Sequence, residues 1–171
     1  MEIETERLIL RPLALADLDA LVELQAEPEV SRFMGAYGRA ELSAWVGSVR
    51  KEWASRGHGR MAIVERGSGR FVGRTGMRHW PEFDEVELGW ALSPEVRGRG
   101  YATEAAGACL EWGLRELEVE YVTAMIDPDN SPSIAVAERL GMQPLREDVL
   151  LGDAVIIYAT AVANRPPGSA S

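Results

Sequence analysis

Cysteine, histidine and lysine are scarce in this sequence of 171 residues. The single cysteine, Cys109, excludes an internal disulfide and any zinc site built from several cysteines. With only His58 and His79 as further soft ligands, no structural metal is expected. Lys51 is the only lysine, and the sequence contains no Gly-Lys pair. This excludes the phosphate-binding loop of NTPases, which requires G-K-[ST].

Long apolar runs are also missing, since no stretch approaches the roughly 20 residues of a membrane-spanning helix. The N-terminal MEIETERLIL is acidic and lacks the charged-then-apolar form of a signal peptide. Hydrophobic residues make up 46% of the chain and charged residues 26%, which is ordinary for one globular domain. We therefore expect a cytoplasmic protein with one domain over residues 1–163 and a flexible tail, NRPPGSAS, over 164–171.

The chain is acidic, with a net charge of −9. Because nucleic-acid-binding domains usually carry a basic excess, this balance argues against nucleic-acid partners. It favours a cationic partner, such as an amine, a polyamine or a basic peptide. The alternative is that the acidic surface serves only solubility.

Hydrophobic periodicity predicts strands and helices in a mixed order: strand, two helices, three strands, helix, strand, helix, two strands. The segments are 5–13, 15–25, 39–53, 60–80 (a hairpin around Gly67-Ser68-Gly69), 85–93, 101–116, 120–126, 131–141 and 142–162. In 131–141, Ser131 and Pro132 signal a helix start and Gly141 a stop. Meandering strands followed by alternating helices and strands predict an α+β fold, a mixed sheet flanked by helices in three layers.

The most informative stretch is PEVRGRGYATEA, which joins an apolar strand to a helix. The first N–H groups of a helix have no intrahelical partner and carry partial positive charge. Gly98 and Gly100 remove the Cβ atoms that would hold a phosphate away, and Arg97 and Arg99 add charge. The stretch therefore predicts a site for a phosphate-bearing ligand. The alternative is that the glycines only shape a turn.

A dinucleotide-binding fingerprint fits this loop poorly, because it needs G-x-G-x-x-G or G-x-G-x-x-A. Here Thr103 stands at the third position, and the preceding strand does not open a βαβ unit. A small-molecule NAD enzyme is thus a distant alternative.

The sequence RGRGYA resembles the R/Q-x-x-G-x-G/A signature of the GNAT superfamily of acyl-CoA-dependent N-acetyltransferases. TERLILRPL, ELGWALSPEVRGRGYATEA and DPDNSPSIAVAERLGM are similar to its RimJ/RimL-like branch, which acetylates ribosomal-protein N-termini and other amines. These motifs follow the family's order over roughly residues 5 to 160. The resemblance implies a mostly antiparallel sheet of about seven strands, splayed between the fourth and fifth.

The resemblance also implies a site for acetyl-CoA as co-substrate, with no metal. Backbone amides of the glycine loop would bind the pyrophosphate, and the end of the fourth strand and an asparagine would bind the pantetheine arm. The cofactor residues expected from this are Trp90, Ala91, Leu92, Arg97, Gly98, Arg99, Gly100, Tyr101, Ala102, Thr103 and Asn130.

Acetyl transfer to an amine needs a neutral nitrogen, although an alkyl amine has a pKa near 10. The leaving thiolate must also be protonated or stabilised. Ser133 matches the serine that serves as general acid in this branch; many relatives use a tyrosine, but none lies between Tyr121 and Tyr158. The alternative for Ser133 is a first-turn serine that satisfies the backbone.

The general base is less well defined by the sequence. Glu87 matches the carboxylate of the family's ELG strand motif, although strand alternation places it opposite Leu88 and Trp90. Glu85 and Glu147 compete for the role, solvent can also serve, and Glu87 can instead be a half-exposed strand charge.

Other reactive or aromatic side chains have simpler explanations. Cys109 lies on the apolar stripe of helix 101–116, which favours packing in the core over an acyl-enzyme role. His58 and His79 are expected at strand edges, with a base role for His79 as the alternative. Aromatic candidates for an acceptor pocket, or for core and rim packing, are Trp80, Phe83, Phe33 and Tyr37.

The sequence thus predicts an N-acetyltransferase that moves the acetyl group directly, within a ternary complex, to a primary amine on a protein N-terminus or a small molecule. The alternative from another class is a non-catalytic acyl-CoA sensor on the same fold. The identity of the amine, and whether the protein is a monomer or a homodimer, are left open.

Overall fold

The computed structural model describes residues 1–160. Residues 161–171, which include the expected tail and the last residues of the expected domain, lie outside the described part. Within residues 1–160, no helix combines the length and the apolar character that a membrane crossing demands.

Eight strands and five α-helices make up the described chain. The strands are β1 (Ile3–Glu4), β2 (Leu8–Pro12), β3 (Arg60–Glu65), β4 (Phe71–Trp80), β5 (Glu85–Leu92), β6 (Thr123–Ile126), β7 (Gln143–Leu150) and β8 (Asp153–Ala159). The helices are α1 (Leu18–Ala26), α2 (Pro28–Met34), α3 (Arg39–Arg56), α4 (Tyr101–Glu116) and α5 (Ser131–Arg139).

All eight strands form one sheet in the order β1-β2-β3-β4-β5-β6-β8-β7. Every neighbouring pair is antiparallel except β5 and β6, which are parallel. Their ladder consists of a single residue pair, Glu87 with Thr123, so the strands separate beyond it. This confirms the predicted mixed sheet and its splay between the parallel strands.

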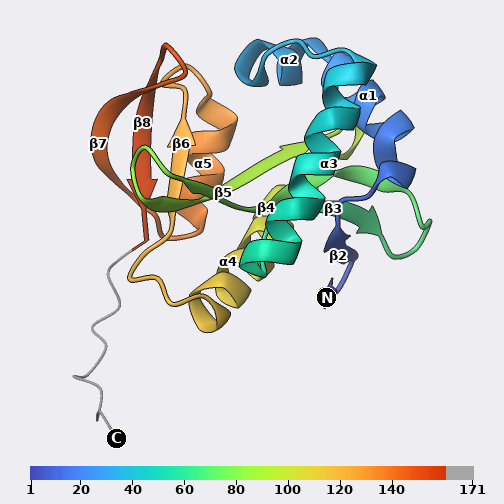
Figure 1. Ribbon diagram of the computed structural model, residues 1–171, viewed down its shortest axis with the longest axis horizontal. Helices are drawn as coiled ribbons and strands as arrows, with labels where there is room; N and C mark the ends of the chain where they lie inside the picture. Colours follow the sequence, from blue (N-terminus) through green and yellow to red (C-terminus); the bar gives the residue numbers. More distant parts are fainter. Residues whose placement is uncertain (161–171) are drawn as a thin grey trace, which may run out of the picture.

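Helices cover both faces of the sheet, which gives three layers (Figure 1). One core contains the β5 residues Leu88, Trp90 and Leu92, packed with residues of α4 and α5. The other contains Ala91 of β5, packed with residues of α1, α2 and α3. Successive β5 side chains therefore face opposite layers, as strand geometry requires.

Three local features differ from the sequence-based expectation. The short helix α2 was not predicted, although Pro28 at its start is a good first helical residue. Its seven residues are too few for a clear apolar period. Strand β1 adds an eighth strand where about seven were expected. Helix α5 is capped by Asn130, whose side chain accepts the Ser133 N–H, and not by Ser131.

Candidate active site

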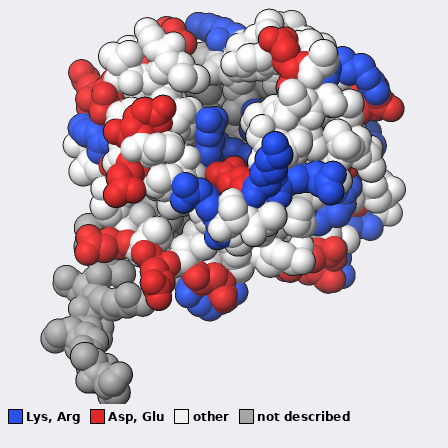
Figure 2. All heavy atoms as spheres, in the orientation of Figure 1, with Lys and Arg blue, Asp and Glu red and all other residues white. Residues whose placement is uncertain are grey.

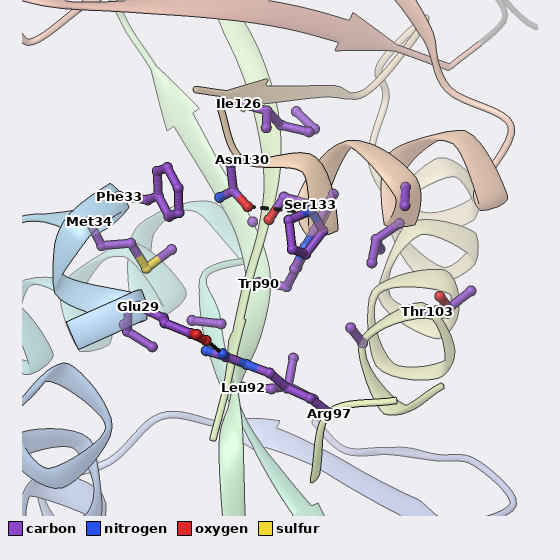
Figure 3. A pocket seen from close by; sticks show the side chains of 18 of the residues that line it. Glu29, Phe33, Met34, Trp90, Leu92, Arg97, Thr103, Ile126, Asn130 and Ser133 are labelled. Atoms are coloured by element: carbon purple, nitrogen blue, oxygen red, sulfur yellow. Dashed lines mark hydrogen bonds and ion pairs between the residues drawn. The ribbon is translucent and has the colours of Figure 1, made fainter. Parts of the chain in front are cut away.

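A cavity of about 1090 Å³ opens where β5 and β6 separate. Its walls come from β5, from the loop and first turn that begin α4, from β6, from α5 and from α2. Figure 3 shows Phe33 and Met34 on the α2 wall, across from Ser133 and Trp90. Because the walls include residues from both layers, the cavity passes through the splay from one face of the sheet to the other.

Nearly all residues predicted for the site line this single cavity. From the cofactor set these are Trp90, Ala91, Leu92, Arg97, Gly98, Gly100, Tyr101, Ala102, Thr103 and Asn130, and from the catalytic set Glu87 and Ser133. Arg99 is the exception: its carbonyl accepts from Arg7, and its guanidinium lies 3.7 Å from Glu65.

The glycine loop has the geometry of an anion site. Gly98 and Gly100 have φ of 72° and 76°, in the left-handed region that side chains rarely adopt. A Cβ at Gly98 would meet no atom within 4 Å, so this backbone is open to a ligand. Gly100 is the N-cap of the 16-residue helix α4, and the first intrahelical bond is from the Glu104 N–H to the Gly100 carbonyl. The N–H groups before Glu104 are thus free for an anion.

One ion pair crosses the mouth of the cavity near this loop. Arg97 pairs with Glu29 of α2, and Figure 3 shows the two side chains meeting between their elements. Both side chains are well exposed, at 40% and 68%. An exposed pair of this kind contributes little free energy, so Arg97 is readily available to a phosphate.

Asn130 and Ser133 lie side by side at the start of α5 (Figure 3). The Asn130 Oδ1 accepts the Ser133 N–H at 3.3 Å, which caps the helix. The Ser133 side chain is half-buried in the cavity wall. The cap uses the backbone N–H of Ser133 and leaves its side chain free. Within residues 1–160 the Ser133 hydroxyl has no hydrogen-bond partner. The hydroxyl is therefore free to act on a ligand.

Glu87 is held in place by two donors. Its Oε2 accepts from Arg60 Nη2 at 2.7 Å and from Trp80 Nε1 at 2.9 Å. The Arg60 and Glu87 side chains are only 8% and 11% exposed. The Glu87 Oε1 accepts no hydrogen bond from the described residues, so the carboxylate keeps one free oxygen in the cavity wall. The expectation of a half-exposed strand charge is wrong, because the side chain is buried in an ion pair.

The competing carboxylates lie elsewhere. Glu85 is buried and forms a two-bond pair with Arg146, at 2.9 and 3.0 Å. It also accepts from the Tyr121 hydroxyl at 3.1 Å. Glu147 is exposed on the edge strand β7, away from the cavity.

The thiol of Cys109 and the imidazoles of His58 and His79 lie outside the cavity lining. Cys109 is fully buried in the core, and burial raises the pKa of its thiol to about 12, so it is not a nucleophile at neutral pH. His79 lies 3.1 Å from Asp84, beyond the cavity lining, and His58 is buried. The residues 1–160 hold no group of three or more His, Cys, Asp or Glu residues suited to a metal ion.

Of the aromatic candidates, only Phe33 lines the cavity. Trp80 is buried as a hydrogen-bond donor, and Tyr37 is 49% exposed. Three arginines near the site, Arg60, Arg74 and Arg78, were not predicted from the sequence. Arg60 pairs with Glu87, and Arg74 and Arg78 lie on β4 beside β5. Their one visible signal is the spacing of Arg74 and Arg78, which places both on the same face of β4.

Comparison with known proteins places these features in a family. Residues 7–143 match the domain described as Acetyltransferase (GNAT) domain. YnaD, an uncharacterized N-acetyltransferase of Bacillus subtilis, is 27% identical over 145 residues, covering 84% of this chain and 83% of that protein.

Solved structures have the same architecture. An acetyltransferase from Agrobacterium tumefaciens is 35% identical, with a TM-score of 0.81 and 93% of each chain covered. A RimL ribosomal L7/L12 α-N-protein acetyltransferase solved with coenzyme A shares the fold, with a TM-score of 0.78 at 19% identity, over 93% of this chain and 97% of that one.

Proposed function

This chain belongs to the GNAT family of acetyltransferases, and from that premise we propose that it transfers the acetyl group of acetyl-CoA to a primary amine, by direct transfer in a ternary complex. The observation that carries the proposal is the cavity through the splayed sheet. It joins an anion site at α4 to an opening beside α2. A cofactor and an acceptor can therefore meet from opposite faces of the sheet.

The residues at the α4 end fit the phosphates of coenzyme A. Free N–H groups follow Gly98 and Gly100, open backbone lets a phosphate approach, and Arg97 adds charge. The backbone of Trp90 to Leu92 and the Asn130 amide line the path inward, where the pantetheine arm would lie. The fold shared with a protein solved with coenzyme A supports this placement.

Acetyl-CoA supplies an activated acyl group, and two side chains of this protein handle the protons. The Ser133 hydroxyl donates to the sulfur as the carbon–sulfur bond breaks. The free Oε1 of Glu87 accepts the proton that the attacking amine releases, directly or through one water. Arg60 holds the carboxylate in position through Oε2, which leaves Oε1 without a hydrogen bond from residues 1–160.

The test is binding followed by turnover. Calorimetry should show that acetyl-CoA binds and that NAD and ATP do not. A panel of amines should then be incubated with the protein and acetyl-CoA, with release of the CoA thiol as the signal. Mass spectrometry should find each accepted amine heavier by one acetyl group. Tight binding without turnover on any amine would contradict the proposal and favour an acyl-CoA sensor.

A further inference from the structure

An arginine-rich surface lies on the side of β3, β4 and β5 that faces α1–α3. Arg60 hydrogen-bonds Glu87, the one carboxylate of this cluster, and Arg78 lies opposite Glu87 in the β4–β5 ladder. Arg74 lies four residues before Arg78, on the same face of β4. Arg60 is satisfied, because it pairs with Glu87 at 2.7 Å and donates to the Gly76 carbonyl at 2.6 Å. The other carboxylate of β5, that of Glu85, already forms an ion pair with Arg146. The cluster is thus left with more positive than negative charge.

Arg74 is the buried member of this cluster that has no carboxylate partner among the described residues. It is only 9% exposed, and its Nε has no hydrogen-bond partner within residues 1–160. Its Nη2 lies 3.0 Å from the Met34 sulfur, and its guanidinium stands 4.9 Å from the Trp45 ring centre. A thioether is a weak acceptor, so a buried charge is left poorly compensated. Burial first, and then repulsion by Arg60, lowers the pKa of Arg74 to about 9.

Arg78 does not relieve this imbalance. Its guanidinium lies 3.8 Å from the centre of the Trp80 ring, and it forms no ion pair with the described carboxylates. Figure 2 shows a hollow near the middle of the face in view, with both Lys or Arg and Asp or Glu atoms around it. A local excess of positive charge therefore exists on a chain whose net charge is −9.

The three arginines do not line the cavity themselves, but Arg74 lies directly behind residues that do. Arg74 lies opposite Ala91 in the β4–β5 ladder, and it contacts Met34; both of those residues line the cavity. Arg60 lies over Gly89, where an added Cβ would come within 2.5 Å of its Nη1. The cluster thus lies behind the cavity wall formed by β5 and α2, and a shift of the Met34 side chain would expose Arg74 to the cavity.

We propose that the acceptor is an amine that also carries a carboxylate, such as a free amino acid, and that Arg74 binds this carboxylate. The inference rests on the proposed acetyl transfer and names the class of its acceptor. Arg74 can present two parallel N–H donors, which match a carboxylate. Met34 is unbranched and flexible, so its sulfur can give way to the better acceptor. This acceptor is the opposite of the cationic partner expected from net charge, because charge interactions weaken with distance and a ligand in the cavity is affected most by the nearest groups.

The first experiment compares α-amino acids with their amides as acceptors. Each pair presents the same amine and differs only in the anionic group. At a given pH a larger fraction of the amide than of the acid has a neutral, reactive amine. This difference favours the amides, so a preference for the acids cannot come from it. Wild-type protein should show kcat/KM values about 10- to 100-fold higher for the acids, as a charged hydrogen bond would give. Equal values, or preference for amides or polyamines, would overturn the inference while leaving acetyl transfer established.

Variants then separate binding by Arg74 from a structural role. Arg74→Met keeps the side-chain length and should abolish the preference for acids, so that the kcat/KM values for an acid and its amide become similar. Arg74→Lys keeps the charge and should restore part of the preference. Arg70→Met is the matched control, since Arg70 is half-exposed and pairs with Glu95 outside the cavity. A lower melting temperature for Arg74→Met, with the acid preference unchanged, would show that Arg74 serves only the fold.

A binding experiment makes the inference testable without turnover. An N-acetyl amino acid and its amide should be compared as probes in thermal-shift titrations with CoA present. The acid should raise the melting temperature of wild type at lower concentration than the amide, and Arg74→Met should lose this difference. Equal shifts in wild type would overturn carboxylate binding. If acetyl-CoA fails to bind but the acid probe still stabilises the protein, the proposed transfer falls and the carboxylate site stands.

Discussion

Replacing Glu87 by glutamine should destabilise the protein, because the substitution leaves the Arg60 charge buried without its counter-ion. The two side chains are 8% and 11% exposed and lie 2.7 Å apart. Removing one partner of a buried pair costs about 3–5 kcal/mol. Glutamine keeps an acceptor oxygen for Trp80, so we expect the lower end, about 3 kcal/mol. For a chain of this length that corresponds to a fall in Tm of about 6–12 °C.

The assay is thermal unfolding followed by circular dichroism, with urea unfolding as a second measurement. Asp19→Asn is the control, because Asp19 pairs with Arg39 at 80% and 61% exposure, and its loss should cost under about 1 kcal/mol. The double variant Arg60→Met with Glu87→Gln removes the uncompensated charge and should recover part of the loss. If Glu87→Gln melts within about 2 °C of wild type, the pair does not stabilise the fold as argued.

The remaining predictions concern the cofactor loop, the acid and the N-terminal region. Gly98→Val and Gly100→Val should weaken acetyl-CoA binding in calorimetry. Because both glycines have left-handed backbone, each substitution should also lower the free energy of unfolding in urea by about 1–2 kcal/mol. Wild-type affinity for acetyl-CoA in both variants would show that the loop does not bind the cofactor. Ser133→Ala should lower kcat by about 10–10³-fold with cofactor affinity unchanged, and an unchanged kcat where chemistry limits the rate would leave water as the acid. Asn130→Ala should weaken cofactor binding and cost about 1 kcal/mol through the lost cap, so a variant with wild-type cofactor affinity would restrict Asn130 to capping. Burial opposes ionisation of Asp17, but hydrogen bonds from Arg11 and from the Ala14 N–H outweigh it and hold its pKa below the ordinary 3.8. The stability that Asp17 contributes is therefore complete above pH 3.8, and it is lost as the pH falls below that value and through the lowered pKa. The urea midpoints of wild type and Asp17→Asn should then converge as the pH falls in this acid range. A difference between the two midpoints that does not change with pH would contradict this.

The sequence by itself determined those features that depend on neighbouring residues. Gly98 and Gly100 between a strand and a helix predict an anion site, because the free N–H groups and the open backbone come from one continuous stretch. The cofactor residues in this stretch line the cavity, apart from Arg99. Alternation along β5 likewise placed Glu87 opposite Leu88 and Trp90, because the side-chain period of a strand is local.

The sequence did not predict features whose local signals are short or ambiguous. Helix α2 has only seven residues, so its stability comes from packing of Val30 and Met34 against the core and not from a readable period. The cap of α5 moved from Ser131 to Asn130, because both residue types make good caps and the fold selects between them.

The charges of the site were decided by tertiary structure alone. Arg60 reaches Glu87 across 27 positions of sequence, and Arg146 reaches Glu85 across 61. Once these pairs form, Arg74 is left as a buried guanidinium without a carboxylate. Sequence composition counts only the sum of charges, −9 here, whereas a ligand in the cavity meets the groups that strand register brings within a few ångströms of it. Pairing across the sheet thus determines which charges remain to bind a substrate, and no local pattern in the sequence carries that information.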